Sequence, residues 1–195
     1  IDLKQFKKVL PYLPDVEGWL GGSLHYVDSE GQMMLSADMN LDNFVYEKSP
    51  LGNWTMSGAY LPGDNNAHHV DGFITYNDQE IIYMNGVYQA NETGQENITG
   101  ELELQHFPLR VINPFIPEKM VAFTGDIDGT LSMTGSPMKP VLNGGLQLDS
   151  VLMIMPDMSV GFRFDNKQVK MQDSKMVFDK FNIYTRGETP FVING

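Results

Sequence analysis

The stretch "GDIDGTLSM", Gly125 to Met133, alternates residue by residue between two kinds of side chain. Every second position is apolar or glycine, as at Ile127, Gly129 and Leu131, and polar side chains fill the positions between them. Successive side chains of a β-strand point to opposite faces of the sheet. This period therefore predicts a strand with one apolar and one polar face.

The same alternation returns along much of the 195-residue chain. It is clear at Met33–Leu41, Glu101–Gln105 and Ser159–Asp165. Turn-forming stretches such as "PGDNN", "GSPMKP" and "FDNK" separate the alternating runs. This alternation is typical of antiparallel strands that have one face exposed to solvent. We therefore expect an all-β chain built on an antiparallel sheet.

Helical patterns are confined to short segments. The spacing of Leu3, Phe6 and Leu10 predicts a short amphipathic helix that Asp2 caps and Pro11 ends. A second helical turn is expected around Leu109–Ile112. We therefore expect a mainly-β fold, with a curved antiparallel sheet and short amphipathic helices.

An internal repeat organises the chain. "GWLGGSL", from Gly18, returns 107 residues later as "GDIDGTL". At the same offset "ADMNLDNF", from Ala37, matches "GGLQLDSV", from Gly144, and "PYLP" returns near the second copy as "PFIP". The repeat predicts β-repeat unit one at residues 1–103 and β-repeat unit two at residues 104–195. Together they read as one continuous domain cut from a longer protein.

The two aspartates of "GDIDGTL" raise the question of catalysis. An Asp-x-Asp-Gly-Thr run resembles the nucleophile and acid/base pair of magnesium-dependent phosphatases. The first copy replaces Asp126 with Trp19 and Asp128 with Gly21, and keeps the glycines, the apolar position, the serine or threonine and the leucine. The repeated positions are therefore structural, and the phosphatase is the least favoured of three hypotheses. We expect a protein that is not an enzyme.

Composition excludes several other functions. Acidic residues exceed basic ones by 12, which argues against nucleic acid and against docking on anionic lipid head groups. No cysteine is present, and no calcium loop is complete, so we expect no metal site. His68 and His69 alternate on a predicted strand and would point apart. No motif indicates a cofactor.

The apolar face of the strands supports two hypotheses. In the first, the sheet is too curved to close and leaves a groove for an acyl chain, which its methionines suit. In the second, two sheets cover each other in a closed β-sandwich that acts as a scaffold or adhesion module without a ligand. Full burial of the apolar face would favour the second. The candidate groove residues are Leu35, Met39, Leu41, Ile127, Leu131, Met133, Leu146 and Leu148.

The segment Phe107–Asp149 resembles the TamB-like proteins of the bacterial envelope, within the wider AsmA-like group. Shared features are Pro108-Leu109, the strand Gly125–Leu131, the turn Gly135–Pro140 and the strand Gly144–Leu148. The first copy matches this pattern more loosely.

The resemblance implies a periplasmic β half-pipe, or β-taco, with an apolar interior and a parent protein anchored in the inner membrane. It also implies an Omp85-class outer-membrane partner and a role in phospholipid transport or in outer-membrane protein translocation and assembly. Partners would then be lipid acyl chains or nascent outer-membrane strands. Exposed sheet edges would favour self-association.

Overall fold

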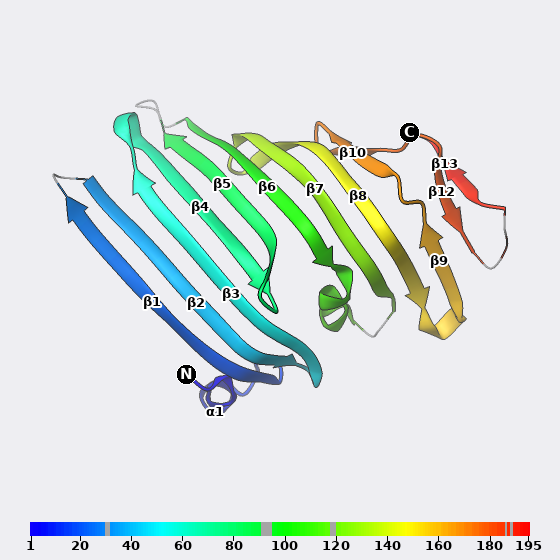
Figure 1. Ribbon diagram of the computed structural model, residues 1–195, viewed down its shortest axis with the longest axis horizontal. Helices are drawn as coiled ribbons and strands as arrows, with labels where there is room; N and C mark the ends of the chain where they lie inside the picture. Colours follow the sequence, from blue (N-terminus) through cyan, green and yellow to red (C-terminus); the bar gives the residue numbers. More distant parts are fainter. Residues whose placement is uncertain (30–31, 91–94, 118–119, 186, 188) are drawn as a thin grey trace. The chain divides into compact units, whose positions relative to one another are not determined.

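The computed structural model describes residues 1–195 except 30–31, 91–94, 118–119, 186 and 188. Strands account for 71% of the chain and helices for 11%, and the strands form a single open antiparallel sheet of 13 strands (Figure 1). The prediction of a mainly-β antiparallel fold is confirmed. The alternative of a closed β-sandwich is wrong, because the sheet is open.

Most strands pair with their neighbours in sequence. The main path of the sheet runs in the order β1-β2-β3-β4-β5-β6-β7-β8-β9-β12-β13. Strand β10 leaves this path and pairs with β8 and β11. The chain divides into two compact units: unit 1 is Ile1–Glu101 with Thr134–Pro140, and unit 2 is Leu102–Met133 with Val141–Gly195.

Unit 1 contains the first five strands. Their bounds, with the short helices, are η1 (Leu3–Gln5), α1 (Phe6–Val9), β1 (Val16–Ser29), β2 (Gln32–Tyr46), β3 (Ser49–Pro62), η2 (Asp64–Asn66), β4 (Ala67–Tyr76) and β5 (Gln79–Ala90). The helix expected at the start is present as η1 and α1, and the Lys4 amide donates to Asp2 Oδ1 over 3.0 Å. Asp2 thus caps this helix as the sequence predicts.

Unit 2 contains most of the remaining elements. They are β6 (Glu96–Pro108), η3 (Leu109–Phe115), β7 (Ala122–Ser136), β8 (Lys139–Met155), η5 (Pro156–Met158), β9 (Val160–Phe164), β10 (Gln168–Gln172), β11 (Lys175–Val177), β12 (Phe181–Tyr184) and β13 (Phe191–Ile193). Strands β6, β7 and β8 begin or end with residues of unit 1. The predicted turn at Leu109 extends into the longer 3-10 helix η3, and "FDNK" separates β9 from β10.

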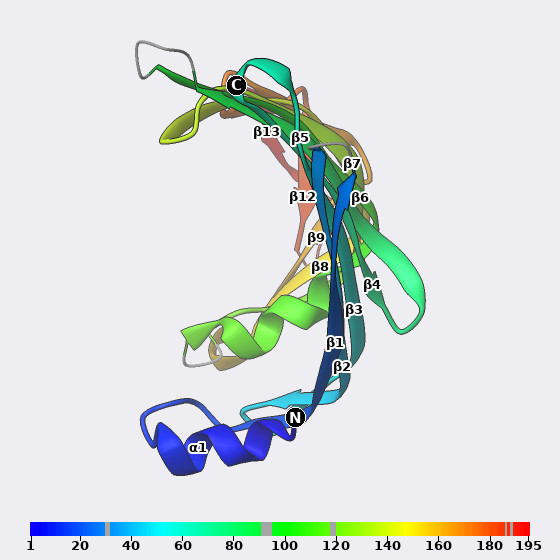
Figure 2. The same ribbon diagram turned by 90° about the vertical axis from the view of Figure 1, so that its left-hand side faces the viewer.

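The repeated glycines form the same irregularity in each unit. Gly18 and Gly125 both have positive φ angles, of 133° and 90°. A Cβ on Gly125 would lie 2.6 Å from the carbonyl oxygens of Asp149 and Ser150, and Ser150 itself has a φ of 52°. Such close backbone approach tolerates only glycine. In unit 1 the register shifts at this level, and the strands turn toward the N-terminal helix (Figure 2).

Asparagine side chains satisfy the backbone where the two units are irregular. The amide of Asn43 donates to Asn53 Oδ1 over 2.8 Å in unit 1. At the matching position of unit 2, the amide of Ser150 donates to Asn166 Oδ1 over 3.2 Å. A backbone group that leaves the ladder needs another partner, and an asparagine side chain supplies it here, from β3 in unit 1 and from the connection between β9 and β10 in unit 2.

Among the residues that the structure describes, few side chains are buried, and in unit 1 these gather at one end of the sheet. Leu51, Tyr76 and Ile81 lie at the ends of β3, β4 and β5 and are each at most 9% exposed. The ring of Trp54 packs on Tyr76 with 4.9 Å between centroids, and its indole donates to the Leu51 carbonyl. The middle of the unit 1 sheet therefore carries little of the core.

Candidate acyl-chain trough

The register of unit 1 places small residues side by side in three neighbouring strands. Ala37 on β2 is the Cα partner of Gly58 on β3, and Gly58 is the partner of Gly72 on β4. None of the three has a side chain larger than a methyl group. They form a low floor that runs across the strands.

Larger apolar residues stand on both sides of this floor. Residues two positions away along a strand lie on the same face of the sheet, and so do directly opposed residues on neighbouring strands. The residues two positions from each floor residue therefore lie on the same face as the floor. One wall is formed by Met39, Met56, Ile74 and Ile82. The other is formed by Leu35, Tyr60 and Val70. We call the floor and these two walls, with Met84 at the β5 end, the unit 1 trough.

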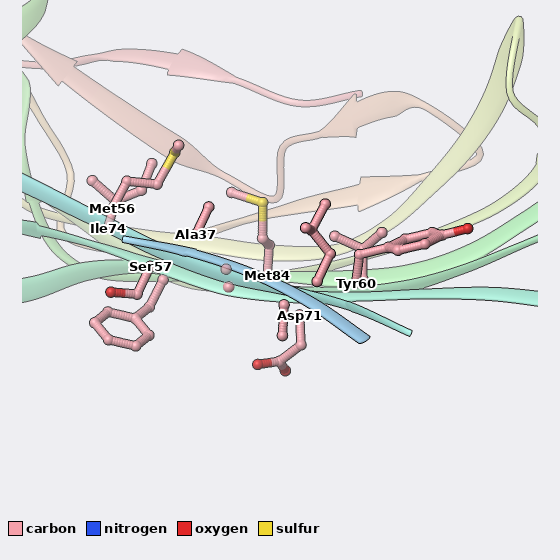
Figure 3. A pocket seen from close by; sticks show the side chains of 13 residues that line it. Ala37, Met56, Ser57, Tyr60, Asp71, Ile74 and Met84 are labelled. Atoms are coloured by element: carbon pink, nitrogen blue, oxygen red, sulfur yellow. The ribbon is translucent and has the colours of Figure 1, made fainter. Parts of the chain in front are cut away.

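The trough is a shallow hollow in the sheet. The hollow, whose lining does not include Met39 or Ile82, has a volume of about 260 Å³, just below the range of about 300–1,000 Å³ usual for ligand pockets. Ala37, Met56, Ile74, Met84 and Tyr60 project on one side of the sheet, whereas Ser57 and Asp71 project on the other (Figure 3). Since neighbouring strands lie about 4.8 Å apart, the path from β2 to β5 is about 14 Å long.

The trough is open to solvent. The side chains of Met39, Met56 and Met84 are 40%, 44% and 36% exposed, and Val70 is 48% exposed. Monomeric soluble proteins rarely leave a contiguous apolar surface uncovered unless it binds a partner or ligand. Exposure of this face is the arrangement that the groove hypothesis requires.

The opposite face of the same strands is more polar, although Met34, Leu61 and Phe73 also lie on it. Ser57 donates to Asp38 over 2.7 Å, and the Tyr83 hydroxyl donates to Asp71 over 2.6 Å. The hydrogen bond to Asp71 raises the pKa of Tyr83 above its usual value, since the carboxylate favours the protonated phenol. Unit 1 thus has one hydrated face tied by side-chain hydrogen bonds and one apolar face.

The sequence-predicted residues of unit 1 all lie on the apolar face. Leu35 and Met39 form parts of the two trough walls. Leu41 lies one row further along, between Leu20 on β1 and Trp54 on β3. Sequence reasoning missed the floor and the contributions of β3, β4 and β5. The alternation of Met56, Gly58 and Tyr60 indicated the apolar face of β3. The register that pairs Gly58 with Ala37 cannot be inferred from the sequence of either strand alone.

The five candidates of unit 2 are half-buried. Ile127, Leu131 and Met133 lie on β7, and Leu146 and Leu148 lie on β8. Leu146 is the Cα partner of Val169 on β10, which is 7% exposed. The unit 2 candidates are thus less open than the three trough methionines.

The close approach of β7 and β8 shows at two glycines. A Cβ on Gly129 would lie 3.0 Å from Leu146 Cα, and one on Gly144 would lie 3.0 Å from Leu131 Cα. The two strands can approach in this way because neither glycine carries a side chain.

The aspartates of "GDIDGTL" lie in the middle of the antiparallel strand β7. Asp128 accepts a hydrogen bond from the His106 amide over 2.8 Å, and its carboxylate lies 3.1 Å from the same histidine's Nδ1. His106 has a φ of 47°, so Asp128 supports a backbone irregularity as the asparagines do elsewhere. The phosphatase motif instead ends a buried parallel strand, and that context is absent from β7.

The histidines of β4 have separate surroundings. His68 Nδ1 lies 2.6 Å from the Tyr60 hydroxyl, whereas the ring of His69 lies next to Gly63. Among the residues that the structure describes, no group of three or more histidine, aspartate or glutamate side chains is placed to hold a metal ion. No helix in that same part of the chain is long and apolar enough to span a membrane.

The chain matches no model of a protein family, no curated protein and no solved structure.

Proposed function

We propose that this chain is part of a TamB-like protein of the bacterial envelope, and that the unit 1 trough holds phospholipid acyl chains as they pass between the inner and outer membranes. The proposal needs no catalytic residue. It is supported by one observation above others: an apolar floor of Ala37, Gly58 and Gly72 lies between apolar walls in which Met56 and Val70 are exposed to solvent. A periplasmic location, an inner-membrane anchor on the parent protein and an Omp85-class partner belong to the same proposal through the sequence resemblance.

An acyl chain suits this surface better than a nascent outer-membrane strand does. A strand brings unpaired backbone amides and carbonyls, and these groups need hydrogen-bond partners wherever water is removed. The walls of the trough offer almost entirely hydrocarbon and thioether groups, with the Tyr60 hydroxyl engaged by His68. A hydrocarbon chain has no such requirement, so the trough accepts it without leaving polar groups unpaired.

The apolar contact is large enough to remove a lipid chain from water. Each buried methylene contributes about 0.8 kcal/mol, so a dozen methylenes contribute about 10 kcal/mol before ordering costs. Part of this free energy is lost because the trough covers the acyl chain on one side only. The remainder suits a carrier that must release its cargo as well as bind it.

Filling the floor tests the proposal. A Cβ on Gly58 meets only the Asp71 carbonyl oxygen, at an ordinary 3.5 Å, so the backbone accepts a side chain there. We expect Gly58→Leu to fold normally and to lower the affinity for pyrene-labelled palmitate about tenfold, because the new side chain occupies the trough. Ala59→Leu adds a similar side chain to the opposite face of the same strand and should bind as wild type does.

The measurements are fluorescence titration with the labelled palmitate and mass spectrometry of phospholipid that co-purifies with the protein. Circular dichroism and urea unfolding establish that both variants fold. Equal affinity in Gly58→Leu and Ala59→Leu would show that the lipid does not lie in the trough. Absence of binding in the wild-type chain would favour a scaffold without a ligand.

A further inference from the structure

Three methionines border the unit 1 trough. Met39 and Met56 are directly opposed on β2 and β3, and Met84 on β5 is the Cα partner of the floor residue Gly72. Each is between 36% and 44% exposed, so the thioether side chains are accessible to small molecules in solution. Methionine thus contributes to one wall and to the β5 end of the trough.

We propose that Met39, Met56 and Met84 form an oxidation site, and that peroxide converts the trough from an apolar surface to a polar one. In this reaction hydrogen peroxide transfers one oxygen atom to the thioether sulfur. The O–O bond breaks, a sulfur–oxygen bond forms, and water leaves; the sulfur is oxidised by two electrons and the peroxide is reduced. The product is methionine sulfoxide, which methionine sulfoxide reductases convert back.

The change alters binding because a sulfoxide is a strong hydrogen-bond acceptor. A hydrocarbon chain lying over the trough would cover the new oxygen without offering it a donor, and an unpaired polar group of that kind disfavours burial. Water competes for the same position and the apolar wall becomes discontinuous. This consequence depends on the proposed acyl-chain function, whereas the oxidation itself does not.

Strand β2, which contains Met39, also contains a methionine that serves as a control. Met34 on β2 is 42% exposed, close to the value for Met39, but it lies on the opposite face of the strand. Met138 and Met158 are more exposed still and lie outside the trough. Oxidation at these three positions changes surface polarity without changing the trough.

The experiment combines a peptide map with a binding assay. Wild-type protein, the trough variant Met39→Leu/Met56→Leu/Met84→Leu and the control variant Met34→Leu/Met138→Leu/Met158→Leu are treated with hydrogen peroxide. Sulfoxide at each methionine is quantified by mass spectrometry, and affinity for pyrene-labelled palmitate is measured before and after treatment. Methionine-to-leucine changes conserve volume, so both variants should fold, which urea unfolding verifies.

We expect peroxide to weaken binding about tenfold in the wild-type and control proteins and to leave the trough variant unchanged. Methionine sulfoxide reductase should restore the lost affinity. Equal loss in the trough variant, or full binding by wild-type protein oxidised at all three trough positions, would overturn the inference. If untreated wild-type protein does not bind palmitate, the proposed function fails, and the peptide map alone decides whether the three methionines are oxidised.

Discussion

At the scale of single residues, glycine positions explain what the internal repeat retains. Gly18 and Gly125 have backbone conformations that other residues rarely adopt, and each faces the backbone of the next strand at short range. The acids between the glycines do not repeat, and Asp128 supports the His106 amide. A short catalytic motif and a structural strand can thus have the same amino-acid sequence while their side chains have different partners.

A substitution at one of these glycines tests this explanation. Gly125→Ala should lower the free energy of unfolding by about 2 kcal/mol or more, because a φ of 90° is strained for alanine and its Cβ would lie 2.6 Å from two carbonyl oxygens. Gly58→Ala is the matched control, because its Cβ has room, and should change stability by less than about 1 kcal/mol. Urea unfolding measures both, and equal stability of the two variants would contradict the role assigned to Gly125.

At the scale of elements, one side chain fastens a helix to a strand. Asn113 lies in η3, and its side chain makes two hydrogen bonds with the backbone of Phe123 near the start of β7: Nδ2 donates to the carbonyl over 2.8 Å, and Oδ1 accepts from the amide over 2.7 Å. Leu109 and Val111 of the same helix are buried. The asparagine and the two apolar side chains thus fix η3 in unit 2.

Removing this clamp should loosen the start of β7. Asn113→Ala loses both hydrogen bonds and should destabilise unit 2 by about 1–3 kcal/mol, with faster hydrogen exchange at the Phe123 amide. Asn113→Asp keeps an acceptor for that amide and should preserve more of its protection. Unchanged exchange in Asn113→Ala would show that the buried apolar residues alone hold the helix.

Strands and faces were predictable because each depends on local alternation. Met33–Leu41 indicated its apolar face, and the offset between "GWLGGSL" and "GDIDGTL" indicated equivalent strands. The trough floor was not predictable, because it depends on the register that brings Ala37, Gly58 and Gly72 together. Register is a property of strand pairs, and one sequence does not display it.

At the scale of the whole molecule, a net charge of −12 accompanies the exposed apolar face. Acidic charge keeps a protein soluble through mutual repulsion and opposes docking on anionic membranes. In a lipid carrier of this composition, affinity should therefore come from the lipid tail. The head group then adds little to the binding free energy.

Salt dependence tests this point. Affinity for a pyrene-labelled zwitterionic phospholipid should change by less than about threefold between low and high ionic strength, because salt screens charges and leaves apolar contact in place. Fluorescence titration over a range of sodium chloride concentrations provides the measurement. A steep loss of affinity with salt would indicate recognition through the head group.

The direction of the trough has a consequence for how such a protein could change in evolution. Each strand contributes one residue to the floor, as Ala37, Gly58 and Gly72 show. Adding a hairpin would lengthen the path by about two strand spacings and leave its cross-section untouched, whereas exchanging one floor glycine for a larger residue would narrow it at a single point. The length and the width of the trough can therefore change independently in evolution. Duplication of a hairpin changes the length, and a point mutation at a floor residue changes the width.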